Sequence, residues 1–145
     1  MTIYVNSIME HLRATLANDP PLSGYTVQVG RPINKRQDLL PWAGIWPGPM
    51  DIEGHSITAN ANKPWQAMVT INIYHQSYSE LLDETLINDM TIGQREIITA
   101  VSSNLQLDGA VLMLKSISGE MVDFDEAVEE NFITNMLTLI YEVRG

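Results

Sequence analysis

The sequence predicts a single α+β domain over residues 1–145, in which an N-terminal helix and a long central helix pack on a mainly antiparallel sheet. Three patterns carry this prediction. Residues 65–74 alternate apolar and polar side chains with the period of two that marks a half-buried strand. The residues after them space their apolar side chains as an amphipathic helix does, and the last segment alternates again. The predicted order is α-β-β-(long loop)-β-α-β-β.

An amphipathic helix is expected first, over residues 4–17. Its apolar stripe consists of Val5, Ile8, Met9, Leu12 and Leu16. The segment Asp19-Pro20-Pro21 ends this helix, because proline forces the residue before it out of helical geometry. Two strands should follow, at residues 24–31 and 39–46. Pro41 favours an edge position or an irregular entry for the second of them.

Residues 47–64 interrupt these patterns and are expected to form a long loop or a hairpin arm. Pro47-Gly48-Pro49 opens the stretch, and small polar residues close it before Pro64. A short strand at residues 56–58 on a hairpin arm and a long mobile loop both fit the sequence. A connection of this length in a compact domain is usually functional or disordered.

The strand at 65–74 should lead directly into the long helix. Ser77 and Glu80 have the spacing of a capping box, in which the two side chains satisfy the first free amides of a helix. Gly93 is a possible kink. The expected apolar positions of the helix are Leu82, Leu86, Met90, Ile97, Val101 and Leu105.

Two more strands should close the domain. Asp108-Gly109 forms a turn before a strand at 110–117, and Ser118-Gly119 is expected to turn the chain again. After an acidic connector at 120–130, the last strand, at 132–143, should pair with the strand at 110–117. Its buried set should include Ile133, Leu137, Leu139, Tyr141 and Val143. Its polar points are Thr134, Asn135 and Thr138.

The charge of the chain is distributed unevenly. Residues 1–75 hold five basic and five acidic side chains, whereas residues 76–145 hold three basic and thirteen acidic ones and account for the net charge of −10. Such a surface repels phosphate, so we expect no specific nucleic-acid binding. No apolar run approaches the roughly 20 residues of a membrane span, and we expect no membrane partner. The chain has no cysteine for disulfides or thiolate metal sites.

The histidines and the carboxylates do not form a recognisable catalytic or metal-binding pattern. His11, His55 and His75 lack the ligand spacing of a helical zinc site, so solvated or hydrogen-bonded imidazoles are expected. The acidic connector lacks the glycine and alternating ligands of a calcium loop. Its carboxylates are Asp123, Asp125, Glu126, Glu129 and Glu130. We therefore expect no catalytic residue, cofactor or metal. The alternative is a small acidic enzyme or metal-binding domain that uses the 120–130 carboxylates.

Apolar residues in and around the long loop are the candidate interface. Met50, Ile52 and Ile57 would be poorly placed on a free loop, so they either meet a partner or fold back onto the core. Trp46 and Trp65 flank the loop. Tryptophan packs into cores by default, and its alternative role is to anchor an interface.

The order of the elements resembles that of the tail-terminator and tail-completion (head–tail joining) proteins of long-tailed bacteriophages. The helix at 4–17, the strand at 65–74, the helix from Ser79 and the closing strand at 132–143 carry the resemblance. It covers nearly the whole chain as a pattern of elements, without an invariant motif. The segment 41–47 is richer in tryptophan and proline than the family pattern.

The resemblance implies a structural protein without enzymatic activity. It would form a ring, commonly a hexamer, on the last turn of the tail tube, where it stops tube growth and offers a surface to the head connector. Its partners would be further copies of itself, the tail tube protein and the head connector or neck protein. It would be located at the head-proximal end of the tail in the virion, and in the host cytoplasm during assembly. The alternative within the same class is another neck or tail-tube component.

A ring also implies how its surfaces are used. Edge strands would pair between subunits, and the apolar loop residues would add affinity. The acidic residues of the 120–130 segment would then face the DNA channel or its rim, because a strong negative field does not retain a passing phosphate backbone. Solubility alone is the competing interpretation of these charges.

Overall fold

The computed structural model describes residues 5–30, 41–52, 66–78, 84–120 and 132–144, and it confirms the α+β class and the predicted order of elements. Two α-helices and five strands form the described part, with two short 3-10 helices between them. The elements are α1 (Val5–Ala17), η1 (Pro20–Leu22), β1 (Thr26–Val29), β2 (Trp42–Ile52), β3 (Gln66–Tyr78), α3 (Glu84–Ser102), η3 (Leu107–Gly109), β4 (Met113–Glu120) and β5 (Phe132–Arg144).

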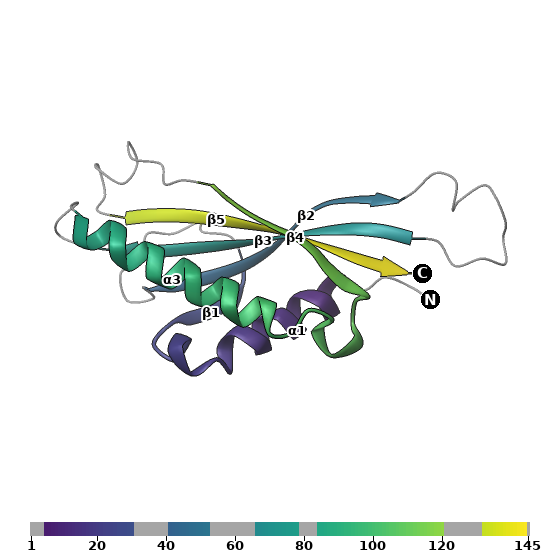
Figure 1. The fold of residues 1–145 in the computed structure, drawn as a ribbon, viewed down its shortest axis with the longest axis horizontal. Helices are drawn as coiled ribbons and strands as arrows, with labels where there is room; N and C mark the ends of the chain where they lie inside the picture. Colours follow the sequence, from purple (N-terminus) through teal and green to yellow (C-terminus); the bar gives the residue numbers. More distant parts are fainter. Residues whose placement is uncertain (1–4, 31–40, 53–65, 79–83, 121–131, 145) are drawn as a thin grey trace, which may run out of the picture.

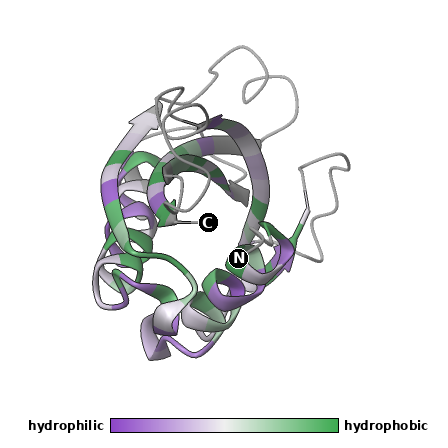
Figure 2. Cartoon of the chain, turned by 90° about the vertical axis from the view of Figure 1, so that its right-hand side faces the viewer, coloured by the Kyte–Doolittle hydropathy of each residue, from purple (hydrophilic) through white to green (hydrophobic). Residues whose placement is uncertain are grey.

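The five described strands form one sheet in the order β1-β2-β3-β5-β4. Strand β1 pairs with β2 in parallel, and the other neighbours are antiparallel. The central pair β3 and β5 stays in register over its full length, from Gln66↔Arg144 to Tyr78↔Phe132. Both α-helices lie on one side of the sheet, and β2 and β3 extend past them (Figure 1). Figure 2 shows that the sheet curls around the core like a trough, which the helices close.

The two strands that flank the central pair, β2 and β4, each contain a β-bulge, and the two bulges lie at the same level of the sheet. Strand β2 has one extra residue between Pro47 and Met50, which pair with Ile71 and Val69 of β3. Strand β4 has one extra residue, Lys115, between Leu114 and Ser116, which pair with Tyr141 and Ile140 of β5. Bulges bend a strand and increase its right-handed twist. The two bulges therefore contribute to the curvature of the sheet.

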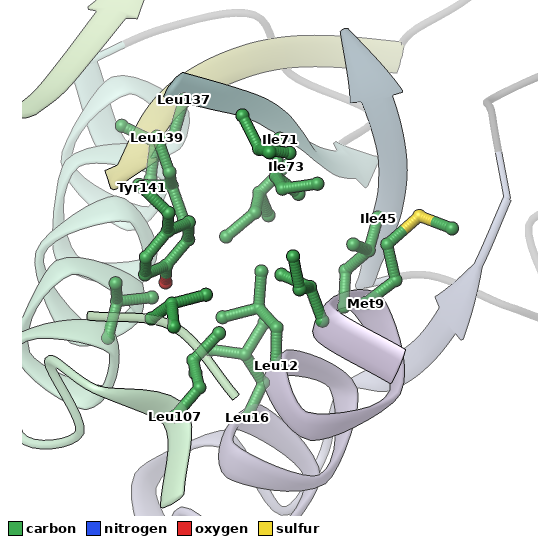
Figure 3. Packing of buried hydrophobic residues seen from close by; sticks show 14 of the residues in the cluster. Met9, Leu12, Leu16, Ile45, Ile71, Ile73, Leu107, Leu137, Leu139 and Tyr141 are labelled. Carbon is green, nitrogen blue, oxygen red and sulfur yellow. The ribbon is translucent and has the colours of Figure 1, made fainter. Parts of the chain in front are cut away.

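The core fills the concave side of the sheet, as the alternation in the sequence predicted. Strand β3 buries Ala67, Val69, Ile71 and Ile73, and β5 buries Leu137, Leu139, Tyr141 and Val143. From the helices, α1 contributes its apolar stripe and α3 contributes Ile97, Ala100 and Val101. Figure 3 shows side chains of α1, β2, β3 and β5 gathered in one cluster, with Leu107 at its edge beside Leu16. Neither α1 nor α3 combines the length and the apolar character that a membrane span requires.

The predicted end of the second strand at Trp46 is wrong, because β2 continues to Ile52 through both prolines. The carbonyls of Pro41 and Ile45 accept hydrogen bonds from backbone N–H groups in and just after β1. Backbone N–H and C=O groups two residues apart in a strand point to the same side. The N–H group that Pro47 lacks would therefore point toward the side of β2 on which β1 has already ended. It therefore removes no hydrogen bond from the β2–β3 ladder. Residues 53–65 lie outside the described residues, so the nature of that connection stays a prediction.

Three further details of the sequence prediction need correction. Ser118-Gly119 is not a turn but part of β4, where both residues pair with β5. Asn135 is buried, 6% exposed, because its pairing with His75 places it on the core side of the sheet. Leu105 lies beyond the end of α3 and is 41% exposed. The expected capping residue Glu80 and the start of the long helix at 79–83 lie outside the described residues.

Candidate interaction surface on the sheet

Trp46 and Met50 lie on the part of β2 that has no strand on its outer side among the described residues. Strand β1 pairs with β2 only as far as Ile45. Trp46 is 39% exposed and lies on the outer face, which we define as the face of the sheet opposite the helices. Met50 pairs with Val69 and is 46% exposed. The last part of β2 extends past the helices (Figure 1). Both predicted interface residues are therefore accessible.

At the level of Trp46, a row of polar side chains crosses the outer face from β3 to β4. Trp46 pairs with Asn72, Asn72 with Thr138, and Thr138 with Ser118. The hydroxyl of Thr138 donates a hydrogen bond to Oδ1 of Asn72 over 3.2 Å. This contact fixes the Asn72 amide between two strands. An apolar ring beside a fixed polar row is a common composition for a protein contact surface.

Trp42, in contrast, is a packing residue. Its indole Nε1 donates a hydrogen bond to Oε1 of Gln28 over 3.0 Å, and the side chain is 6% exposed. The ring lies over Gly44, where an added Cβ would come within 2.0 Å of the indole. The glycine therefore leaves the space that this tryptophan occupies. Of the two described tryptophans, only Trp46 is available to a partner.

A second exposed apolar group lies at the opposite edge of the sheet, and the sequence analysis did not identify it. It comprises Leu105, Leu112 and Met113, which are 41%, 37% and 36% exposed. The backbone between them is unusual: Leu107, Asp108 and Gly109 have φ values of 45°, 57° and 94°. Positive φ is costly for a residue such as leucine. Leu107 is fully buried, and its packing holds this turn in place.

Side chains from α1 and the end of α3 support the same turn. Asn104 accepts a hydrogen bond from the backbone N–H of Asp108 at 3.2 Å and donates one to the hydroxyl of Thr15 at 3.0 Å. Nδ1 of His11 lies 3.6 Å from Oδ2 of Asp108. The Asp-Gly pair was visible in the sequence. The exposure of the leucines around it depends on tertiary contacts, so it could not be predicted from the sequence.

His75 forms a buried polar contact on the other side of the core. Its Nε2 and the hydroxyl of Tyr25 are hydrogen-bonded at 3.0 Å, which agrees with one of the two environments expected for the histidines. Burial lowers the pKa of His75 to about 4, so the ring is neutral at pH 7. The packing of α3 at Gly93 encloses the ring. This contact is structural, and no described carboxylate approaches the ring as a catalytic partner would.

The remaining predicted site residues are described in part or not at all. Ile52 pairs with Ala67 through its backbone. Ile57, Trp65 and His55 lie outside the described residues, as do all five carboxylates of the channel prediction, Asp123, Asp125, Glu126, Glu129 and Glu130. Among the described residues, no group of three or more His, Asp or Glu side chains is arranged to hold a metal ion.

Comparisons with known proteins find similarity to solved structures alone. No family model matches the chain, and no curated protein matches its sequence. A solved chain from the "Virion of native gene transfer agent (GTA) particle" is similar over 97% of this chain and 96% of its own length, with 13% identity and a TM-score of 0.48. A similarity of this size identifies neither a family nor a function.

Proposed function

We propose that the protein is a structural, non-enzymatic component of a phage-type virion. The observation that carries this proposal is the fold itself. Its element order is the one in which the sequence resembles tail-terminator and tail-completion proteins. Neither described α-helix covers the outer face of its sheet, and apolar side chains are exposed at two edges, as a protein that works by assembly requires. The virion is accordingly its location, after assembly in the host cytoplasm.

Within the virion, the proposed role is that of a tail terminator. Several copies, six by the resemblance, form a ring on the last turn of the tail tube. This ring stops tube growth and presents its other side to the head connector. The arm that contains Trp46 and Met50 contacts a neighbouring copy or the tube, and Ile52, Ile57 and Trp65 belong to the same contact. Apolar anchors surrounded by polar residues are typical of such interfaces.

A tube-growth experiment tests this role. Tail tube protein is polymerised on its initiator with and without the purified protein, and tube lengths are measured by electron microscopy. A terminator yields tubes closed at one end by a ring and competent to bind heads. A tube component would instead be incorporated along the tube, and a neck component would bind heads without affecting tube length. A protein that does none of these is not a tail protein.

The 120–130 carboxylates are proposed to face the channel or its rim. Replacing Asp123, Asp125, Glu126, Glu129 and Glu130 by their amides should leave rings intact but slow DNA ejection at low salt. The physical reason is that a negative wall does not bind phosphate, and its field is stronger in a narrow channel. Unchanged ejection from normally assembled particles would show that these carboxylates serve solubility alone.

A further inference from the structure

At two edges of the sheet, Asp51 with its neighbour Met50 on β2 and Met113 on β4 lie at the same level, whereas Trp46 lies at the level of Ser118. One continuous row of paired residues crosses the sheet from Asp51 on β2 through Met68 and Glu142 to Met113 on β4. Among the described residues, β2 is unpaired on its outer side beyond Ile45, and β5 is the one strand that pairs with β4, while the N–H of Leu114 donates a hydrogen bond to the carbonyl of Leu105. The row therefore runs from one free edge to the other. In a repeating assembly, the β2 edge of one copy can therefore meet the β4 edge of the next copy at the same level of the sheet.

The β2 edge, which we define as Trp46, Pro47, Met50 and Asp51, is suited to side-chain contact. Trp46 and Met50 are 39% and 46% exposed, and Asp51 is exposed beside them. Pro47 offers no N–H to an added strand, and the bulge that follows it disrupts the regular ladder. Strand addition is therefore unfavourable here, whereas packing of side chains is not.

The β4 edge, which we define as Leu112, Met113 and Lys115 together with Leu105, has the complementary composition. Its three apolar residues are each more than one third exposed. Lys115 occupies the bulge of β4, and its side chain is 47% exposed. Its amino group lies 3.0 Å from the carboxylate of Glu142, a residue of the crossing row. The amino group has three N–H donors and can bind a second carboxylate.

We propose that copies of this chain associate head to tail, with the β2 edge of one copy packed against the β4 edge of the next, so that Asp51 faces Lys115. Contacts between like edges would instead bring two Asp51 carboxylates or two Lys115 amino groups together. On a chain of net charge −10, a contact between copies needs such a local pairing of opposite charges. This inference deepens the proposed function, because it assigns the contact that builds the ring.

The direction of the proposed contact determines the kind of assembly. A head-to-tail contact repeats in one direction and produces a ring if the rotation closes, or a filament if it does not. The sheet already curls between its two edges (Figure 2). In this proposal side chains form the interface at this part of β2, whereas the resemblance implied strand pairing between subunits.

A charge exchange in the full chain tests the proposal. Asp51→Lys and Lys115→Glu each place like charges across the contact, whereas the double variant restores an opposite pair. Sedimentation velocity at low salt should show that each single variant raises the concentration of half-assembly about tenfold. The double variant should return to within about threefold of the original protein. Glu84→Lys and Arg95→Glu are the matched controls, since they change the net charge equally at exposed positions of α3.

Mixing the two single variants provides a second, independent measurement. In an alternating assembly, Lys at position 51 of one variant meets Glu at position 115 of the other, and the reverse contact keeps the original pair. The mixture should therefore assemble at a lower concentration than either variant alone. Circular dichroism of every variant establishes that it is folded, and the mixture remains informative if the double variant does not fold.

Three results would overturn the contact: a chain that never self-associates, single variants that assemble normally, or folded variants that neither the double exchange nor mixing restores. The outcome is distinguishable from failure of the proposed function. Rings that follow the charge exchange but do not bind tail tubes retain the contact and exclude the terminator role. Rings that cap tubes and are insensitive to these charges retain the role and exclude the contact.

Discussion

Gly93 of α3 lies directly against the imidazole of His75 on β3. A Cβ at position 93 would come within 2.5 Å of Cε1 of His75 and within 2.3 Å of the Tyr25 hydroxyl oxygen. The absence of a side chain therefore allows the helix to approach the sheet closely. The helix continues through this glycine, so the residue that the sequence marked as a possible kink is a packing contact.

Gly93→Ala should destabilise the protein despite the higher helix propensity of alanine. The substitution gains about 1 kcal/mol of helix propensity, but the clash with two fixed rings costs more, leaving a net loss of about 1–2 kcal/mol. Urea unfolding measures the difference. Gly24→Ala is the control, because an added Cβ there has no neighbour within 4 Å. Equal stability of Gly93→Ala and the original protein would contradict the close contact.

Stability should fall as the pH decreases from 6.5 to 4, and His75 should account for much of the fall. Burial lowers its pKa from 6.5 to about 4 in the folded protein, so in this window the unfolded chain binds a proton that the folded protein does not. The histidine thus contributes stability above pH 6.5 that is lost toward pH 4, about 3 kcal/mol in all.

The comparison with His75→Gln isolates this contribution, since glutamine does not titrate and can still bond to Tyr25. Unfolding free energies at pH 7 and pH 4.5 should differ less in the variant than in the original protein. The carboxylates titrate in both proteins and cancel in the comparison. Identical pH dependence of the two proteins would show that His75 is not buried as described.

Tyr141→Phe should leave the protein equally stable or stabilise it by up to about 1 kcal/mol. The Tyr141 hydroxyl is buried without a hydrogen-bond partner among the described residues, and it points toward the apolar side chains around Leu107 (Figure 3). Burial also raises the pKa of this phenol, so it stays neutral. Tyr141→Ala should instead lose about 3–5 kcal/mol through the cavity it leaves. Thermal unfolding distinguishes these outcomes. A marked loss in Tyr141→Phe would reveal a partner for the hydroxyl.

Trp46→Ser and Met113→Ser should weaken assembly while leaving the fold unchanged. Both side chains are more than one third exposed in the single chain, so little packing is lost on their removal. Because both side chains would anchor the contact between copies, each substitution should raise the concentration of half-assembly about tenfold or more. Ile87→Ser is the matched control, because Ile87 is an exposed apolar residue of α3, 49% accessible. Sedimentation velocity provides the measurement. A comparable effect of the control would indicate nonspecific apolar association.

The parts of the fold that depend on local patterns could be predicted from the sequence, and the parts that depend on neighbouring strands could not. Alternation identified the buried residues of β3 because each strand presents one face to the core. It failed at Pro47 and at Ser118-Gly119, where residues typical of turns lie inside strands. A proline can occupy a strand when its missing N–H faces a free edge, and the sequence does not reveal which edge is free.

The candidate interaction surface could likewise be predicted from the sequence only in part. Trp46 and Met50 stood out in the sequence as apolar residues beside an irregular stretch, and both are exposed. Leu112 and Met113 look like ordinary strand residues, and their exposure follows from the position of β4 at the edge of the sheet. The relation between Asp51 and Lys115 depends on the register of four strands and on two bulges, which no local pattern encodes.

Electron microscopy of the purified protein at increasing concentration, alone and mixed with tail tubes, is the direct test for a ring that caps the tail tube. We expect closed rings of one size that increase in number with concentration and that occupy one end of each tube. A protein that remains monomeric at the highest concentration and leaves both tube ends bare would contradict it.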